Sequence, residues 1–242
     1  MRGIYIHIPF CRQACRYCDF YFSVSLQYMD RFVDSLVEEI RQQGEKNSGI
    51  SAETLYLGGG TPSLLSARHL GKIINAIYKY YSFQEKAEWT IECNPDDLNE
   101  KLVKQLRKSG FNRLSIGIQS FHDRDLKIMR RSHNARQAEE SVHLASAGGF
   151  DLITADLIYG IPGQSLAEWK ENIDRALSLP LTHLSAYHLT FEPGTVFDHW
   201  KKKGRLVPVP EEDSIEQYRT MREKLLSAGF IHYELSNFGR GD

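Results

Sequence analysis

Residues 11–18 read Cys11-Arg-Gln-Ala-Cys15-Arg-Tyr-Cys18, and this stretch decides how the rest of the chain is interpreted. Its three cysteines stand at spacings of four and three, directly after the apolar alternating run Ile4-Tyr-Ile-His-Ile8. Thiolates on one short loop can hold three corners of a four-iron cluster and leave the fourth iron open to a small molecule. A structural zinc site would need a fourth ligand, for which His7 and Asp19 are the nearest candidates. The spacing favours the iron–sulfur cluster, and a zinc-stabilised barrel stays open as an alternative.

The composition is that of an ordinary globular protein with a sizeable core. Of the 242 residues, 41% are hydrophobic and 25% are charged, and the formal net charge is −1. This balance gives no electrostatic reason to expect nucleic acid as a partner. No apolar run approaches the roughly 18 residues of a membrane helix, and the chain enters its first apolar run without an export signal. We therefore expect a cytoplasmic protein whose clustered thiols stay reduced and serve metal binding or catalysis.

Strand-like and helix-like patterns alternate along the whole chain. Apolar runs predict strands at 4–8, 54–57, 89–93, 113–119, 152–159 and 183–190. Apolar residues at helical spacing predict helices around 32–40, 70–81, 102–106, 122–130, 135–147 and 211–228. Ser66 has the position and chemistry of an N-cap, and Ser165-Leu-Ala-Glu168 has the pattern of a capping box that opens one more helix.

Six strand–helix units in one line predict an α/β fold whose parallel strands are joined by right-handed crossovers. An open doubly wound sheet and a barrel both meet this description. Polar or glycine-rich residues at or near the carboxyl ends of nearly every strand favour a partial (β/α)6 barrel that is open on one side, because that rim carries the active site of α/β barrels. They are Cys11–Cys18, Gly58–Thr61, Glu92, Gln119, Asp156 and Glu192.

The end of the chain predicts a second region. We assign residues 1–230 to the partial-barrel core and residues 231–242 to the start of a further C-terminal region. A barrel this open would expose a sheet edge near its last strand, and natural proteins usually cover such edges. We therefore expect that the chain is a fragment or that a partner covers the opening.

The motif C-x3-C-x2-C after a first strand, with Tyr17 directly before the third cysteine, resembles the signature of the radical S-adenosylmethionine (SAM) superfamily. The segments 5–11 and 17–20 resemble more closely the branch that holds the oxygen-independent coproporphyrinogen III oxidases and related haem chaperones. The resemblance extends from Tyr5 to Asn237. It implies a [4Fe-4S] cluster whose open iron chelates the amino and carboxylate groups of SAM. In this family an electron from the cluster cleaves SAM to a 5′-deoxyadenosyl radical, while the protein supplies position and a dry cavity.

The resemblance also implies which residues hold the two cofactors, and it assigns no catalytic residue. Cys11, Cys15 and Cys18 match the cluster ligands. The run Gly58-Gly-Gly-Thr-Pro62 matches a motif that binds the methionine amino group, and glycine lets the backbone approach a ligand closely. The positions that match SAM contacts are Tyr5, Tyr17, Gly59, Gly60, Thr61, Glu92, Gln119, Arg131 and Asp156.

Each of these residues has a structural alternative, in packing, a tight turn or a salt bridge. Glu92 interrupts an otherwise apolar strand, which costs free energy unless the carboxylate is paired. Its neighbour Cys93 has the character of a small buried hydrophobic residue.

Two departures from the decarboxylating enzymes bear on the function that the resemblance implies. Those enzymes carry a further cysteine two residues after the third cluster cysteine, where this chain has Phe20. They also have a long segment before the first strand, whereas Tyr5 lies almost at the N-terminus here. Both differences favour a haem chaperone that takes an electron donor as one partner and hands haem to a membrane acceptor. A radical oxidase acting on coproporphyrinogen III or another tetrapyrrole is the alternative.

Haem as a ligand raises the question of its axial donor, for which imidazole is a common choice. The candidates are His133, His183, His188 and His232, and nothing in the sequence selects among them. Members of this branch carry a C-terminal domain beyond the region matched here. We therefore expect the SAM site to be complete in this chain and the machinery for haem transfer to be incomplete.

Overall fold

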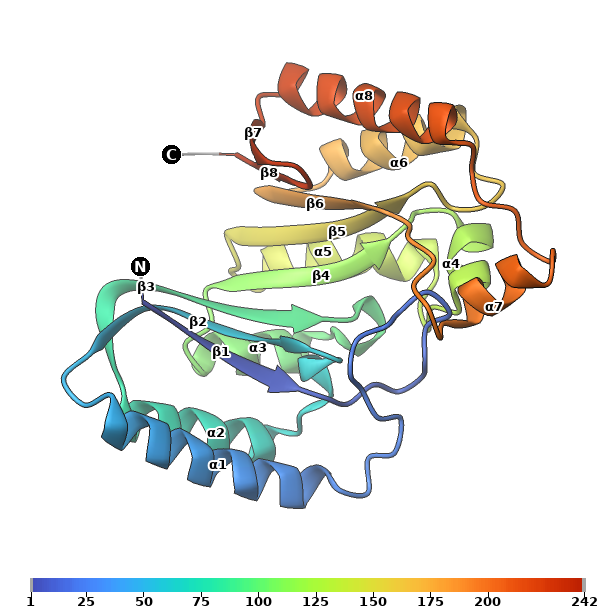
Figure 1. Cartoon of the computed structure of the whole chain (residues 1–242). Coiled ribbons are helices and arrows are strands. Elements are labelled where there is room, and N and C mark those ends of the chain that lie inside the picture. Colours follow the sequence, from blue (N-terminus) through green and yellow to red (C-terminus); the bar gives the residue numbers. More distant parts are fainter. Residues whose placement is uncertain (1, 241–242) are drawn as a thin grey trace.

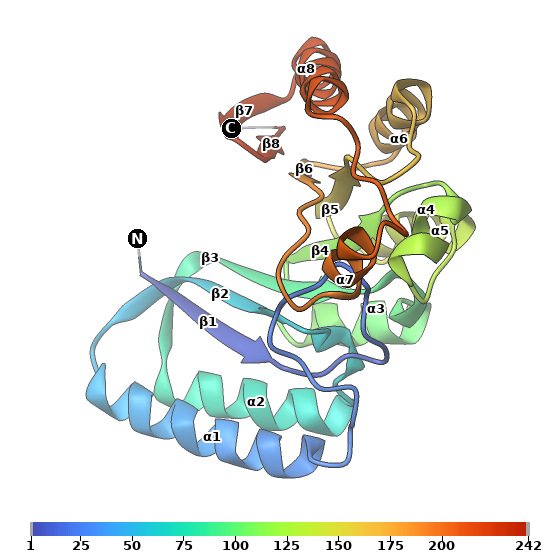
Figure 2. The same cartoon turned by 45° about the vertical axis from the view of Figure 1, so that its right-hand side comes forward.

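The computed structural model describes residues 2–240, so Met1, Gly241 and Asp242, which the expected domain boundaries include, lie outside the described residues. One eight-stranded sheet runs through this part of the chain in the order β1-β2-β3-β4-β5-β6-β8-β7 (Figures 1 and 2). Strands β1 to β6 are parallel neighbours. Their bounds are Gly3–Ile8, Ser51–Gly59, Ser82–Cys93, Arg113–Gln119, Leu152–Tyr159 and His183–His188. The expected α/β fold, a parallel sheet open on one side, is confirmed.

Helices cover the outer face of this curved sheet. In Figures 1 and 2, α1 and α2 lie outside β1 to β3, and α6 and α8 lie outside β5 and β6. The helices α1 to α8 span Met29–Lys46, Ala67–Tyr80, Glu100–Lys108, Asp123–Met129, Ala135–Ala147, Leu166–Ser178, Val196–Lys202 and Glu211–Ser227. Short 3-10 turns occupy Pro62–Leu64 and Pro95–Asp97.

The sequence signals for two helix starts are confirmed. The Ser66 side chain accepts a hydrogen bond from the backbone N–H of His69 and caps α2. Ser165 and Glu168 form both halves of a capping box at the start of α6. These bonds satisfy N–H groups that the first turn of a helix leaves without partners, each contributing about 1 kcal/mol.

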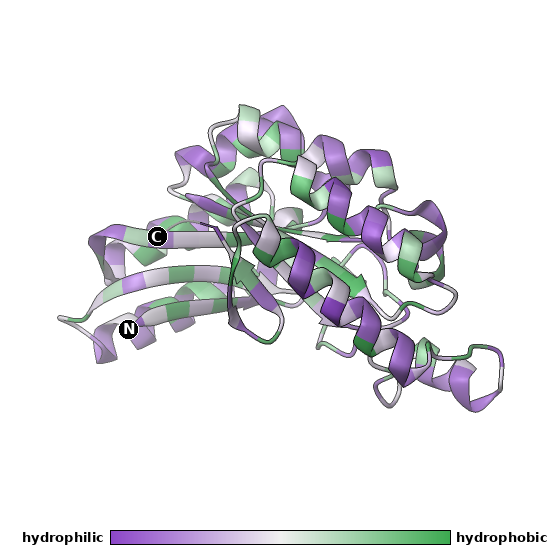
Figure 3. Ribbon diagram, turned by 90° about the horizontal axis from the view of Figure 1, so that it is seen from above, coloured by the Kyte–Doolittle hydropathy of each residue, from purple (hydrophilic) through white to green (hydrophobic). Residues whose placement is uncertain are grey.

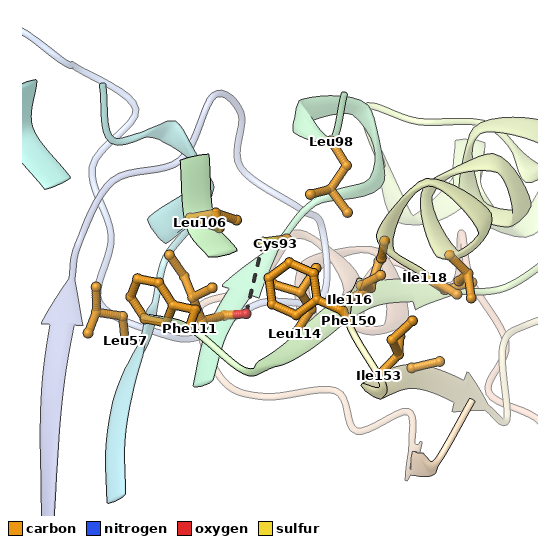
Figure 4. Close-up of a cluster of buried hydrophobic side chains, with 14 of the residues drawn as sticks. Leu57, Cys93, Leu98, Leu106, Phe111, Leu114, Ile116, Ile118, Phe150 and Ile153 are labelled. Atoms are coloured by element: carbon orange, nitrogen blue, oxygen red, sulfur yellow. Dashed lines mark hydrogen bonds between the residues drawn. The ribbon is translucent and has the colours of Figure 1, made fainter. Parts of the chain in front are cut away.

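The two faces of the sheet differ in chemistry because successive side chains of a strand point to opposite faces. The outer face carries buried apolar residues such as Leu57, Leu114 and Ile153, which pack with Phe111 and Phe150 (Figure 4). The helices above it are two-sided, with hydrophilic and hydrophobic residues alternating along their length (Figure 3). Burial of a large apolar side chain stabilises a fold by roughly 1.5–3 kcal/mol, so this layer holds the barrel together. The inner face is left free for polar side chains.

The C-terminal part departs from the expected arrangement. Strands β7 (Ile231–Glu234) and β8 (Asn237–Gly239) form an antiparallel pair, and β8 pairs antiparallel with β6. The edge of β6, which we expected to be exposed, is therefore covered by the chain itself. Both strands are short and β7 is mostly exposed, so neither carries the apolar run of the others, although Phe238 of β8 is buried. The domain boundary expected near residue 230 stays a prediction.

Two further elements differ from the expectation. Strand β3 starts at Ser82, seven residues before the predicted start, because its polar first half continues the pairing with β2. Helix α7 was not expected in the loop that follows β6. Among the residues that the structure describes, no helix is long and apolar enough to cross a membrane.

Candidate functional site

A cavity of about 850 Å³ lies along the inner face of the sheet and reaches the loop that follows β1. Its wall contains all but one of the residues that we expected to hold the cofactors, and these residues lie up to 145 positions apart in the sequence. These are Cys11, Cys15, Tyr17, Cys18, Gly59, Gly60, Thr61, Glu92, Gln119, Arg131 and Asp156. The arrangement follows from the topology, since parallel strands end at one rim and their carboxyl-terminal loops share it.

The three loop cysteines are free thiols, each partly buried at the cavity wall. Thr61 donates its hydroxyl to Cys11 Sγ at 3.4 Å, and Arg131 Nη1 donates to Cys15 Sγ at 3.5 Å. Burial raises the pKa of the Cys11 thiol and raises that of Cys18 to about 11. Deprotonation in this pocket therefore needs a compensating cation, which a metal centre provides.

The donor set fits a cluster better than a single ion. Within residues 2–240, no three His, Cys, Asp or Glu side chains converge closely enough to hold one metal ion. The thiols instead face one cavity as separate soft donors, and in a [4Fe-4S] cluster each thiolate binds a different iron. Donors from Thr61 and Arg131 point at the sulfur atoms, as hydrogen bonds that tune such clusters do. The residues present fit the group that the family resemblance implies.

Arg16 fastens the cysteine loop to the far half of the barrel. Its backbone N–H donates to Met129 O at 3.0 Å, and its guanidinium Nη1 donates to Ile128 O at 3.1 Å, at the carboxyl end of α4. Its carbonyl accepts from the Phe197 N–H at 3.1 Å, and its guanidinium lies 4.7 Å from the centre of the Trp200 ring on α7. The loop after the first strand is thus held by elements that come much later in the chain.

A second fastening joins the loop to the turn after β3. Arg12 donates from Nε and Nη2 to one carboxylate oxygen of Asp97, at 3.0 and 2.9 Å, while Ser63 donates to the other at 2.7 Å. The Asp97 side chain is only 2% exposed, whereas that of Arg12 is 57% exposed. The buried carboxylate has partners on both oxygens, so it holds the cysteine loop in place at little desolvation cost.

The glycines after β2 let two backbone segments touch. Gly60 N–H donates to Ile8 O at 2.9 Å, and a Cβ at Gly60 would lie 2.7 Å from Phe10 O. Gly59 has φ of 110°, which favours glycine, and a Cβ there would lie 2.5 Å from His7 Nδ1. A larger residue at Gly60 would overlap the backbone that leads into the cysteine loop, and one at Gly59 would overlap the ring of His7.

Two hydrogen bonds fix the side chain of Glu92 at the cavity wall. Its two carboxylate oxygens accept from the Tyr56 hydroxyl at 2.8 Å and from the Gly59 N–H at 3.0 Å. Burial raises the pKa of Glu92, and these two hydrogen bonds oppose the rise. The carboxylate that interrupts the apolar strand is therefore paired, as its desolvation cost requires.

Asp156 faces the same space from β5. Ser115 donates to its Oδ2 at 3.3 Å. Burial, together with the nearby charge of Glu92, raises the pKa of Asp156 to about 7, and the hydroxyls of Ser185 and Ser115 oppose the rise. Two carboxyl groups close together in a hollow accept hydrogen bonds from hydroxyl or amino groups of a ligand, and strongly perturbed carboxyl groups in a cleft are typical of functional sites.

Gln119 and Arg131 close the cavity wall at the carboxyl end of β4. Gln119 has φ of 68°, a left-handed conformation that costs free energy in a residue with a side chain and that clusters at functional sites. Arg131 Nη2 donates to Asn94 Oδ1 at 2.6 Å and to Gly117 O at 2.9 Å. These bonds fix the plane of the guanidinium beside the cysteine loop, where it can pair with a carboxylate.

The two tyrosines that match SAM contacts in the sequence lie in different surroundings. Tyr17 lines the cavity, and burial raises the pKa of its phenol. Tyr5 does not line the cavity: it is 58% exposed, and its ring stacks on that of Tyr56 at 5.9 Å. Its hydroxyl lies 3.3 Å from His7 Nδ1. In this structure Tyr5 packs beside the wall residue Tyr56, on the same face of the sheet.

Of the four histidines considered as haem ligands, two line the cavity and two do not. His183 and His188 line the cavity. His133 lies behind the wall, where its Nε2 pairs with Ile118 O at 3.0 Å and burial lowers its pKa to about 4. His232 stacks on Phe238 with ring centres 4.4 Å apart, away from the cavity. Only two of the four imidazoles can reach a ligand in this space.

Several residues of the site were missed in the sequence. Asn94 and Asp97 follow the carboxyl end of a predicted strand, so the rim rule used for Glu92 could have included them. Arg113 lines the cavity at the amino end of its strand, which that rule does not cover.

Comparisons with known proteins agree on the family. The sequence model of the radical SAM superfamily matches residues 5–176. A protein named heme chaperone HemW from Synechocystis sp. is 38% identical over 98% of this chain and 58% of its own length. HemW of Bacillus subtilis is 38% identical over 99% of this chain and 64% of its own. The chain thus spans about three fifths of the length of these curated relatives.

A solved structure gives the same answer at the level of the fold. Coproporphyrinogen III oxidase (HemN) from Escherichia coli superposes with a TM-score of 0.90 and 26% identity, over all of this chain and 56% of that one. Elp3 from Methanocaldococcus infernus, at 20% identity and a TM-score of 0.64, shares the fold alone. With a cysteine loop, a glycine turn and paired carboxylates around one cavity, this chain belongs to the radical SAM superfamily.

Proposed function

We propose that this chain is the SAM-binding part of a haem chaperone. The observation that carries the proposal is one cavity in which three thiols face a glycine turn, two carboxyl groups and a fixed guanidinium. The cysteine thiolates would bind a [4Fe-4S] cluster. Haem is proposed as the ligand because the relatives are named heme chaperone HemW. The thiols require a reducing compartment, which supports a cytoplasmic location.

The chain's own groups divide the work of binding SAM. The cluster, when bound, would supply an open iron and one electron. The backbone at Gly59 and Gly60 offers close approach to the methionine amino group, and the guanidinium of Arg131 offers a fixed positive charge for the carboxylate. Glu92 and Asp156 would accept hydrogen bonds from the rest of the nucleotide, and the polar side chain of Gln119 would contact it between them.

An oxygen-independent coproporphyrinogen III oxidase is the alternative, favoured by the TM-score of 0.90 to HemN. Phe20 counts against it, since the resemblance places a further cysteine of the decarboxylating enzymes there. The side chain of Phe20 is 67% exposed at the cavity mouth, where it offers contact surface and no thiol. In either case an electron donor is required, and for the chaperone we propose a membrane protein as the haem acceptor.

Anaerobic reconstitution tests the proposal. We expect four irons per chain, an electron spin resonance signal that changes when SAM is added, and stable binding of added haem. The Cys93→Ala variant is the matched control, because Cys93 is a buried thiol outside the loop. It should keep the cluster. Formation of a vinyl-bearing tetrapyrrole from coproporphyrinogen III would establish the oxidase instead, and colourless protein containing zinc would refute both.

A further inference from the structure

The cavity continues past the level at which SAM is expected. Its wall includes the inner-face residues Thr90 and Thr154, two positions before Glu92 and Asp156 on the same strands, and it ends among the amino-terminal residues of β4 and β6. In Figure 1 the strands run from this end toward the cysteine loop, so the two lie at opposite ends of the sheet. The interior of an α/β barrel is normally packed with bulky aliphatic side chains. A hollow, polar interior indicates space for a second ligand.

We name the far end of this cavity the floor and define it by Arg113, Thr154, His183 and Tyr233, all of which line the cavity. Arg113 Nη1 donates to Thr154 Oγ1 at a long 3.4 Å. Its buried Nε lies 2.9 Å from Glu88 Oε2 and forms an ion pair with it. This contact does not have the geometry of a hydrogen bond, and the Nε–H has no other partner within the described residues. The guanidinium has five N–H donors, so most of its capacity is unused.

Glu88 balances the charge of Arg113 but leaves most of the N–H donors of the guanidinium without a partner. The Glu88 side chain is 39% exposed and that of Arg113 is 21% exposed. A pair this close to water contributes about 1 kcal/mol or less. A ligand carboxylate that enters the cavity can therefore share or replace Glu88 at small cost.

His183 and Tyr233 add a neutral donor beside this charge. His183 Nε2 lies 2.7 Å from the Tyr233 hydroxyl, while its Nδ1 is buried and has no partner among residues 2–240. Burial and the charge of Arg113 lower the pKa of His183 to about 4, so the imidazole is neutral near pH 7. If the tyrosine donates to Nε2, the Nδ1–H is free. If Nε2–H donates instead, the tyrosine O–H is free. Either tautomer leaves one donor for a ligand.

We propose that the floor binds a carboxylate, and that this carboxylate is a propionate side chain of the bound tetrapyrrole. The identity of the ligand rests on the proposed function, whereas the excess of donors over acceptors at the floor does not. A fixed cation flanked by neutral donors suits a carboxylate, because charge-assisted hydrogen bonds are the stronger ones. The tetrapyrrole would then enter with its acidic edge away from the cysteine loop.

Binding of haem and of haem dimethyl ester, whose carboxylates are blocked, tests the proposal on the reconstituted chain. Arg113→Gln should weaken haem binding about tenfold, as expected for one charge-assisted bond, and should leave ester binding unchanged. Glu88→Gln frees the guanidinium and should strengthen haem binding about two- to fivefold, again without effect on the ester. Arg68→Gln is the matched control, because it removes an equally charged side chain that is 71% exposed and outside the cavity.

The opposite signs of the two variants separate binding from folding, since a purely structural ion pair would be weakened by either change. Should Arg113→Gln fail to fold, Glu88→Gln alone still decides. Equal haem affinity in wild type and both variants would overturn the floor site and leave the chaperone proposal standing. Equal losses for haem and ester would do the same. Absence of haem binding in the wild type would overturn both.

Discussion

Asp156→Asn offers a quantitative test of how the site is built. The folded chain raises the pKa of Asp156 from 3.8 to about 7, chiefly through burial and secondarily through Glu92. Between these values the folded state keeps a proton that the unfolded state has released. The contribution of Asp156 to the free energy of unfolding of the wild type therefore falls as the pH rises from about 4 to 7 and is level above that. Asparagine cannot ionise, so the variant lacks this fall.

The size of the effect follows from the same two values. The interval from 3.8 to about 7 corresponds to roughly 4 kcal/mol at 1.36 kcal/mol per pH unit. Asp156 is only partly buried and faces a cavity that holds water when empty, so screening reduces this figure. We expect Asp156→Asn to match the wild type near pH 4 and to exceed its stability by about 2 kcal/mol near pH 8.

Urea unfolding of the apo chain at several pH values measures this difference. Glu85→Gln is the control, because Glu85 is an exposed carboxylate of the same strand as Glu92. Its stability curve should run parallel to that of the wild type. A difference between Asp156→Asn and wild type that is constant with pH, or that shrinks as the pH rises, would refute the reasoning. Because Asp156 is proposed to bind SAM, the gain should come with weaker SAM binding.

Three further predictions concern the cysteine loop and its surroundings. Cys15→Ser should lose the cluster, because two thiolates cannot hold it against solvent, and iron analysis would show retained stoichiometry if this is wrong. Asp97→Asn should lower the free energy of unfolding by about 1.5–3 kcal/mol in urea titrations, because the Arg12 bonds lose their charge, and an unchanged midpoint would contradict the anchor. Gly60→Ala should destabilise the chain by about 1–3 kcal/mol through backbone overlap, whereas Gly71→Ala, in open space within α2, should stabilise it by up to about 1 kcal/mol, as thermal unfolding of the pair would reveal.

Much of the fold could be predicted because burial leaves a periodic trace in the sequence. The strands 113–119 and 152–159 have the predicted bounds, since both carry apolar residues on the helix-covered face along their whole length. The first half of β3 is polar and the hairpin of β7 and β8 is short, so neither carries that trace. Their pairing comes from backbone hydrogen bonds, which almost every residue type can form and which a side-chain pattern therefore does not predict.

The candidate site divides along a similar line. Glu92 could be predicted because a carboxylate near the end of a buried parallel strand faces the shared rim, whereas Asp156 lies in the middle of β5 and faces the cavity from the inner side of the sheet. The exclusion of Tyr5 from the cavity wall could not, because the first strand lies at the edge of the sheet and one of its faces opens to solvent. The anchor between Arg12 and Asp97 joins residues 85 positions apart, and no local pattern records such a pair.

The clasp that Arg16 forms with α4 and with Trp200 on α7 sets an order of events during synthesis. The thiols emerge from the ribosome near the start of the chain, yet the last of their supports follows more than 180 residues later. Contacts this distant in sequence form late, because the intervening chain must first be ordered. The nascent chain thus carries three thiols without their final supports until residue 200 has been made, and binding of the proposed cluster would follow the closing of the barrel.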